Sequence, residues 1–112
     1  MRADLVRGNL EMLILSVLAG GPAHGYGIVE HLRNQSGGAL DLAEGTVYPA
    51  LYRMEADGLL ASAWSTGAGR RKRVYSLTAR GRSALRARER EWTAFVAVVQ
   101  SVLQGAPWPT TA

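Results

Sequence analysis

Apolar side chains recur at helical spacing near the start of the chain. Leucine, isoleucine and valine return every three or four residues from Leu10 to Leu18. This pattern predicts a first helix from about Asn9, or from as early as Asp4, to Ala19. The Gly-Gly-Pro run that follows is expected to stop it.

A second helix is predicted by three apolar residues at helical spacing: Ile28, Val29 and Leu32. Gly25 and Gly27 fall in its first turn, where a bare backbone can closely approach another group, and the glycine pair 37–38 marks its end. The ALDL segment that follows, residues 39–42, alternates apolar and polar positions, so we expect it to be a short strand of a small sheet.

A third helix is expected to begin near Gly45 or Thr46, because Pro49 is tolerated in a first turn and is disruptive deeper in a helix. Gly58 is predicted to close it. Its inward stripe should consist of Val47, Leu51 and Met54.

Two strands, 60–64 and 71–77, are predicted to pair as a hairpin directly after this helix, with a connecting loop too long for a two-residue turn. Tyr75 and Leu77 fall on one face of the second strand, as expected for a strand that is buried on one side. We call this hairpin with its loop, residues 60–77, the wing.

A long last helix is predicted to start at Thr78 and to end before Gly105. Arginine is frequent in its first half. Its apolar positions follow a heptad-like spacing, interrupted at Arg88: Leu85, Trp92, Phe95, Val99 and Val102.

Together these elements predict a mainly α fold with a small β-hairpin. A helix followed at once by a hairpin with a basic loop is the layout of a winged helix-turn-helix. We expect that domain over residues 1–77, a long C-terminal helix over 78–104, and a flexible tail over 105–112. In this layout the third helix fits a DNA major groove and the cationic loop fits the phosphates beside it.

The charge distribution supports a localised polyanion-binding surface. The net charge of the 112 residues is +4, yet residues 1–69 carry four cationic and seven acidic side chains, and residues 70–112 carry nine and two. A solvated basic face would give the same asymmetry. Arginine dominates, and its planar fork suits phosphate and guanine, which favours nucleic acid.

Other functional classes find little support in the sequence. The chain has no cysteine, so thiol catalysis and cysteine-ligated zinc are excluded and a cytoplasmic location is expected. The apolar stretch 12–18 is too short to span a bilayer, and no membrane partner is expected. His24 and His31 lack further ligands at metal-binding spacing. Without a catalytic motif, we expect neither an enzyme nor a cofactor or metal.

Three segments, in order and spacing, resemble the PadR family of transcriptional regulators: VRGNLEMLILSVLAGGPAHGYGIVEHLR, EGTVYPALYRMEADGLL and GRRKRVYSLTARG. The resemblance covers roughly residues 5–103, and the single last helix resembles the family's small branch. It implies that this helix crosses to a partner subunit. It also implies that a flat aromatic compound could bind between facing tryptophans, and Trp92 lies where that tryptophan is expected.

The candidate DNA contacts fall into three groups. Five residues form the expected recognition surface of the third helix: Thr46, Tyr48, Pro49, Tyr52 and Arg53. Gly25 and Tyr26 are expected to offer a backbone N–H and a hydroxyl to phosphate. The wing cations are Arg70, Arg71, Lys72 and Arg73, of which strand alternation lets only some face DNA. Two alternatives stay open: both tyrosines of the third helix could pack on neighbouring helices, and Gly25 could serve close packing.

The apolar side of the last helix is the candidate for a dimer interface or an effector site, and comprises Leu85, Trp92, Phe95, Val96, Val99 and Val102. The alternative is packing on the chain's own first helix. A planar hydrophobic effector between the two last helices is a separate expectation.

The sequence thus predicts a homodimeric repressor that binds double-stranded DNA at a pseudo-palindromic operator and is released by a small hydrophobic or aromatic effector. The alternative is a winged-helix module that binds a protein or a small molecule without any operator.

Overall fold

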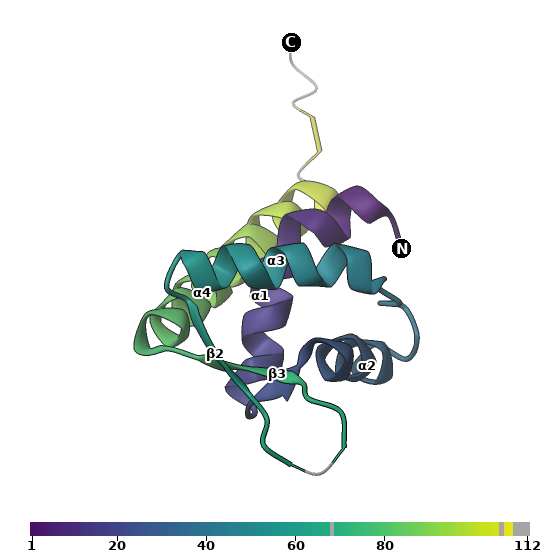
Figure 1. Ribbon diagram of the computed structural model, residues 1–112. Coiled ribbons are helices and arrows are strands. Elements are labelled where there is room, and N and C mark those ends of the chain that lie inside the picture. Colours follow the sequence, from purple (N-terminus) through teal and green to yellow (C-terminus); the bar gives the residue numbers. More distant parts are fainter. Residues whose placement is uncertain (68, 106, 109–112) are drawn as a thin grey trace.

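The computed structural model describes residues 1–67, 69–105 and 107–108. Within these ranges it contains four α-helices and three short strands (Figure 1). In chain order they are α1 (Ala3–Ala19), β1 (Ala23–His24), α2 (Gly25–Gln35), α3 (Glu44–Ala56), β2 (Leu60–Trp64), β3 (Arg73–Leu77) and α4 (Ala79–Gln104). The order confirms the predicted winged helix-turn-helix followed by one long helix.

The helix boundaries differ slightly from those that the sequence predicts. α1 begins at Ala3, close to the earlier of the two predicted starts. α3 begins at Glu44, so Pro49 lies inside the helix, beyond its first turn. The carbonyl oxygen of Ala43 accepts hydrogen bonds from the backbone N–H groups of Thr46 (3.0 Å) and Val47 (3.2 Å), and these bonds fix the earlier start.

The sheet is antiparallel with the strand order β1-β3-β2. The wing register pairs Leu60 with Leu77 at its base and Trp64 with Arg73 near its loop. The second wing strand therefore begins at Arg73 and not at residue 71. The third strand of the sheet is β1, so the prediction of a strand at 39–42 was wrong.

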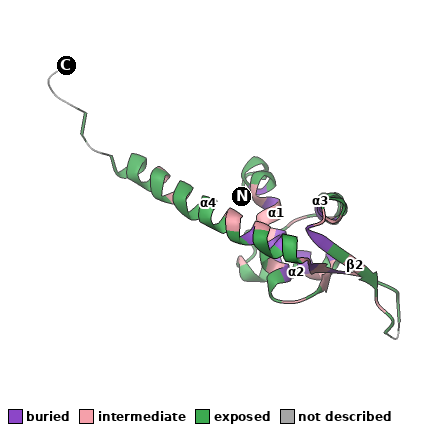
Figure 2. Cartoon of the chain, turned by 90° about the vertical axis from the view of Figure 1, so that its left-hand side faces the viewer, coloured by how far each residue is buried: buried purple, intermediate pink, exposed green. Residues whose placement is uncertain are grey.

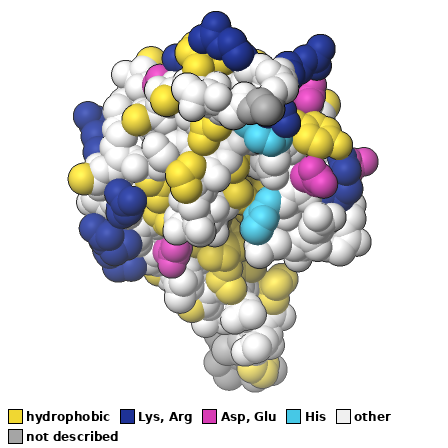
Figure 3. All heavy atoms as spheres, turned by 60° about the horizontal axis from the view of Figure 1, so that its bottom comes forward, with side chains coloured by type: hydrophobic (Ala, Val, Ile, Leu, Met, Phe, Trp, Pro, Cys, Tyr) yellow, Lys and Arg dark blue, Asp and Glu magenta, His cyan; other side chains and the backbone are white. Residues whose placement is uncertain are grey.

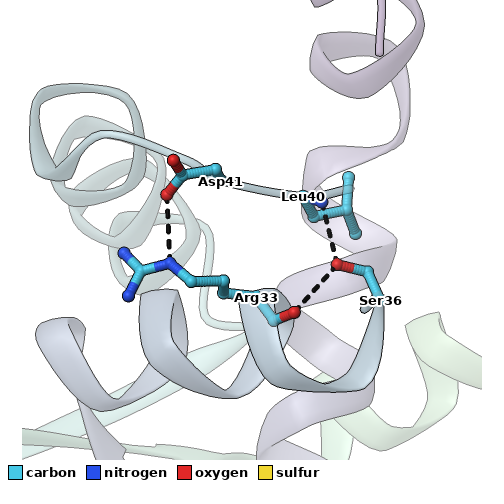
Figure 4. A network of polar contacts seen from close by, with 4 residues as sticks. All are labelled: Arg33, Ser36, Leu40 and Asp41. Carbon is cyan, nitrogen blue, oxygen red and sulfur yellow. Dashed lines mark hydrogen bonds and ion pairs between the residues drawn. The ribbon is translucent and has the colours of Figure 1, made fainter. Parts of the chain in front are cut away.

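Side-chain hydrogen bonds explain why residues 39–42 form no strand (Figure 4). The Oγ of Ser36 accepts from the backbone N–H of Leu40 (2.8 Å) and donates to the carbonyl of Arg33 (3.2 Å). The Nε of Arg33 donates to Asp41 (3.0 Å). Local bonds of this kind compete with a β ladder, and here they hold the segment against the end of α2.

One apolar core joins α1, α2, α3 and the sheet. Its fully buried side chains are Ile14, Leu15, Ile28, Val47, Leu51, Met54 and Tyr75. The predicted inward stripe of α3 is therefore confirmed, and its burial fixes which face of α3 points outward.

The start of α4 is anchored to this core. Thr78 caps it, accepting from the N–H of Gly81 (3.0 Å), and Leu85 is buried. A Cβ on Gly81 would clash with the carbonyl oxygen of Leu59, so a side chain has no room there. The C-terminal part of the helix runs away from the body as an exposed rod (Figure 2).

α4 ends at Gln104, as predicted, and Gly105 adopts a positive φ of 63°. The tail expected at 105–112 falls mostly on residues 106 and 109–112, outside the described residues. None of the helices in the described ranges is long and apolar enough to cross a membrane.

Candidate nucleic-acid interface

The outer face of α3 presents the residues predicted for recognition. Thr46, Pro49 and Arg53 are exposed and follow the i, i+3, i+7 spacing of a single helix face. Tyr52 is 58% exposed on the flank that faces the wing, and Tyr48 beside it is half-buried. Their ring centroids lie 6.2 Å apart.

The start of α2 lies directly beside Tyr48. A Cβ on Gly25 would stand 2.5–2.7 Å from the ring and hydroxyl of Tyr48, so Gly25, which is buried, serves close packing of the two helices. The adjacent Tyr26 is 49% exposed, and it presents its ring at the surface.

His24 caps α2 and lies parallel to Tyr26. Its Nδ1 accepts a hydrogen bond from the N–H of Gly27 (3.1 Å), and the two rings are 6.4 Å apart at 6°. His24 therefore precedes α2 and does not share a helix face with His31.

Two of the four wing cations lie over an aromatic ring. The Cζ atoms of Arg71 and Arg73 lie 4.7 Å and 5.5 Å from the ring centroid of Trp64, within the range of a cation–π interaction. The N–H of Ser65 donates to the carbonyl of Lys72 (2.8 Å) and holds the strand ends together. Trp64 is a site residue that the sequence did not predict, and it pairs opposite Arg73 in the hairpin.

A hollow of about 540 Å³ lies between the wing, α3 and the start of α2. It brings together seven of the eleven predicted DNA contacts: Tyr26, Tyr48, Tyr52, Arg70, Arg71, Lys72 and Arg73. Its other lining residues are His24, Glu44, Trp64 and Tyr75. We call it the wing hollow. Thr46, Pro49 and Arg53 are exposed on α3 outside its lining, and Gly25 lies beneath it.

The face of the molecule that carries the wing is rich in cations. Figure 3 shows Lys and Arg side chains gathered at the top of that view, with others at its left-hand edge. Arg70, Arg71 and Lys72 are exposed. A concave surface lined with cations and aromatic rings suits a phosphate backbone.

Tyr75 in β3 lines the hollow from below and is fully buried. Its hydroxyl has no hydrogen-bond partner among the described residues. Burial raises the pKa of Tyr75 above its ordinary value of 10.0, and nearby Tyr52 raises the pKa further.

A polar network that the sequence analysis missed joins α3 to both wing strands. Ser62 donates to the carboxylate of Glu55 (2.6 Å), and Arg73 donates through Nε to the Oγ of Ser62 (2.8 Å). The Arg73 guanidinium also lies 3.5 Å from Glu55. Only the folded arrangement reveals this network, because its three members come from three different elements.

The predicted face of α4 divides into a buried start and an exposed remainder. Leu85 belongs to the core of its own chain, so it is not available as an interface residue. Phe95 and Val102 are 60% and 74% exposed. Trp92 is partly exposed, and Val96 and Val99 are half-buried.

Part of this face also borders α1. A groove of about 310 Å³ lies between the two helices and is lined by Leu5, Met12, Trp92 and Phe95, among others. Arg88 of α4 pairs with Glu11 of α1 at 2.7 Å. Packing on the first helix, the alternative to a dimer, therefore accounts for the start of the apolar face but leaves its outer part uncovered.

Comparison with known proteins identifies the family. The model of the transcriptional regulator PadR-like family matches residues 14–87. The transcriptional regulator Rv3488 of Mycobacterium tuberculosis is 37% identical over 82 residues, which cover 73% of this chain and 74% of that protein.

Solved structures show the same fold. A PadR family transcriptional regulator from Eggerthella lenta is 35% identical with a TM-score of 0.82, covering 92% of this chain and 88% of its own. PadR of Bacillus subtilis, solved in complex with operator DNA, is 23% identical with a TM-score of 0.63 and shares the fold, covering 92% of this chain and 51% of its own. This chain belongs to the PadR-like family of transcriptional regulators, the class that its sequence favours over enzymes.

Proposed function

We propose that the chain is a homodimeric repressor that reads a pseudo-palindromic operator through α3 and grips the adjacent backbone with the wing. The observation that carries this proposal is the wing hollow, where aromatic side chains of α3 face the exposed cations of the wing loop. A helix with a basic loop beside it complements the major groove and the phosphates along its rim.

The outer face of α3 suits close approach to base edges. Nothing lies within 4 Å of where a Cβ on Gly45 would stand, so the backbone is open at this point. Thr46 can contact a thymine methyl group, and Arg53 can reach the O6 and N7 of guanine with two hydrogen bonds. Pro49 between them adds a flat apolar surface and no side-chain donor that would need a partner.

The wing loop supplies contacts that do not depend on sequence. Arg70, Arg71 and Lys72 are exposed and form no ion pair within the described residues. Stacking on Trp64 restricts the Arg71 guanidinium before DNA arrives, which lowers the entropy lost on binding. Tyr26 and Tyr52 extend the same surface with hydroxyl groups that can donate to phosphate.

α4 provides the surface through which a second copy of the chain binds. Its exposed apolar residues include Phe95, Val98, Val102 and Leu103, and the end of the helix extends past the body (Figure 2). Several large apolar side chains exposed along one helix are typical of a protein interface. Two copies joined in this way present two recognition helices, which calls for an operator with twofold symmetry.

Release from the operator is proposed to involve a small planar hydrophobic effector. The groove beside Trp92 and Phe95, near the middle of α4, has apolar walls on one side and is bordered by Arg88 and Glu91. A ligand there would alter the spacing of the two heads only if it binds one arrangement better than the other.

Removal of the wing charges tests this function. The triple variant Arg70→Gln, Arg71→Gln, Lys72→Gln is compared with Arg80→Gln, Arg86→Gln, Arg90→Gln, which removes equal charge from exposed positions of α4. For a dimer that loses about six phosphate contacts, the slope of log affinity against log salt should become shallower by about 5.

The α4 control should keep the wild-type slope. Equal losses in both variants would mean that only net charge matters, which contradicts a specific grip. Full DNA binding by the wing variant would contradict the proposed grip of the wing on the backbone. Absence of DNA binding by the wild type would favour a winged-helix module that needs no operator.

A further inference from the structure

We infer that Arg73 is a positioning residue: with Glu55 and Ser62 it forms a clamp that sets the orientation of the wing relative to α3. The inference rests on the proposed DNA binding and divides the four wing cations into two kinds. Arg70, Arg71 and Lys72 reach phosphate, and Arg73 holds the surface on which they are displayed.

Strand alternation points Arg73 inward. Successive side chains of a strand face opposite sides, so Arg73 shares a face with Tyr75 and Leu77, which are both buried. On β2 the same face carries Leu60, which is buried, and Ser62. Arg73 therefore points toward α3, on the core side of the sheet, where Glu55 meets it.

Hydrogen bonds and an ion pair connect all three members of the clamp. The 2.6 Å contact from Ser62 to Glu55 is a short hydrogen bond to a charged acceptor, a type roughly twice as strong as a neutral bond. Nε of Arg73 reaches Ser62 at 2.8 Å, and its guanidinium lies 3.5 Å from Glu55. The side chain of Arg73 is 39% exposed and that of Glu55 is 30% exposed. Solvent therefore screens this pair less than it would screen a fully exposed surface pair.

The clamp spans the short connection between α3 and β2. α3 ends at Ala56 and β2 begins at Leu60, with Gly58 between them at a φ of 78°. A rotation there would move the wing loop with respect to the helix. The clamp ties the last turns of α3 to the middle of β2 and the start of β3, and so resists this rotation.

Whether Glu55→Gln strengthens or weakens DNA binding distinguishes a positioning role of the clamp from a purely electrostatic one. Glu55→Gln removes a negative charge from the DNA side of the molecule, and long-range electrostatics alone would then strengthen binding. Loss of the clamp would instead weaken binding, by about three- to tenfold for a broken charge-assisted bond. Glu44→Gln is the matched control, because Glu44 is an exposed carboxylate that lines the hollow and has no ion pair among the described residues.

Arg73 and Arg70 should differ in their salt dependence. Arg70→Gln removes a phosphate contact, so the slope of log affinity against log salt should become shallower by about 0.9 for each subunit bound. Arg73→Gln should lower the affinity and leave the slope unchanged. The Glu55→Gln, Arg73→Gln double variant should bind no more weakly than either single variant, because one clamp is broken in each case.

Hydrogen–deuterium exchange on the free protein gives a readout that needs no DNA. The amides of β2 and β3 should exchange faster in Glu55→Gln and Arg73→Gln than in the wild type, and Arg70→Gln should leave them unchanged. Tighter binding by Glu55→Gln, or a slope that shallows in Arg73→Gln as it does in Arg70→Gln, would overturn the inference. If the wild type itself bound no DNA, the proposed function would fail, and the exchange data would still report on the clamp.

Discussion

Gly25 at the start of α2 lies directly against the ring of Tyr48 in α3, with no room for a Cβ between them. The contact sets the distance between two helices of the DNA-binding domain. It also explains why a glycine occupies this position, although glycine weakens a helix.

Gly25→Ala should therefore destabilise the fold by about 1–3 kcal/mol, as overpacking does in a tight core. Thermal or denaturant unfolding measures this loss. Gly45→Ala is the control, because a Cβ there meets nothing within 4 Å, and it should be neutral or stabilising by up to about 1 kcal/mol. Equal stability of the two variants would show that the helices tolerate a wider separation.

Thr78 connects the turn between α3 and β2 to the start of α4 through a single hydroxyl. Its Oγ1 accepts a hydrogen bond from the N–H of Gly81 and donates one to the carbonyl oxygen of Gly58 (2.7 Å). Thr78→Ala loses both bonds and should cost about 1–2 kcal/mol. Thr78→Ser keeps the hydroxyl and should retain most of the stability in the same unfolding experiment. A Ser variant as weak as the Ala variant would assign the effect to the lost methyl group.

Tyr75 should give the protein a dependence on alkaline pH. Its pKa is raised by burial above the ordinary 10.0, so the folded state holds the proton more tightly than the unfolded state. The corresponding stability is present below pH 10 and is lost as the pH rises from there toward the folded-state pKa.

Tyr75→Phe should remove this loss, and it also removes a buried hydroxyl that has no partner among the described residues. At pH 7 we expect it to be neutral or stabilising by up to about 1 kcal/mol. The measurement is the free energy of unfolding of both proteins at pH 7 and near pH 11. Identical pH profiles would contradict the buried environment of Tyr75.

Phe95→Glu should dissociate the proposed dimer. A charge in the centre of an apolar interface is expected to raise the dimer dissociation constant more than a hundredfold, about 3 kcal/mol. Ala97→Glu places the same charge on the opposite side of α4 by helical spacing and should leave the dimer intact. Sedimentation velocity over a concentration series distinguishes the two. A wild-type monomer at micromolar concentration would contradict the dimer itself.

Much of the fold follows from local sequence. The apolar stripe of α3 and the hairpin alternation at Tyr75 and Leu77 predict their elements, because burial on one face imposes a helical or strand period. The segment 39–42 misleads for a physical reason: its alternation is real, but Ser36 and Asp41 offer side-chain bonds in place of a strand partner.

The site is less predictable than the fold. The basic run 70–73 identifies the wing, yet it does not show that Arg73 points inward to Glu55. It also does not show that the ring of Tyr48 fills the space beside Gly25. Both relationships depend on how elements distant in sequence pack together, which periodicity within one element does not encode.

The most direct test of the account is selection of bound sequences from a pool of random duplexes at a stated salt concentration. The account predicts enrichment of an inverted repeat whose half-sites are about one or two helical turns apart, roughly 10 or 21 base pairs between centres. The wing triple variant should recover much less DNA at the same salt concentration, because it loses phosphate contacts, and the α4 charge control should recover as much as the wild type. Recovery of no common sequence, or of a single half-site without symmetry, would contradict the reading of an operator by two recognition helices.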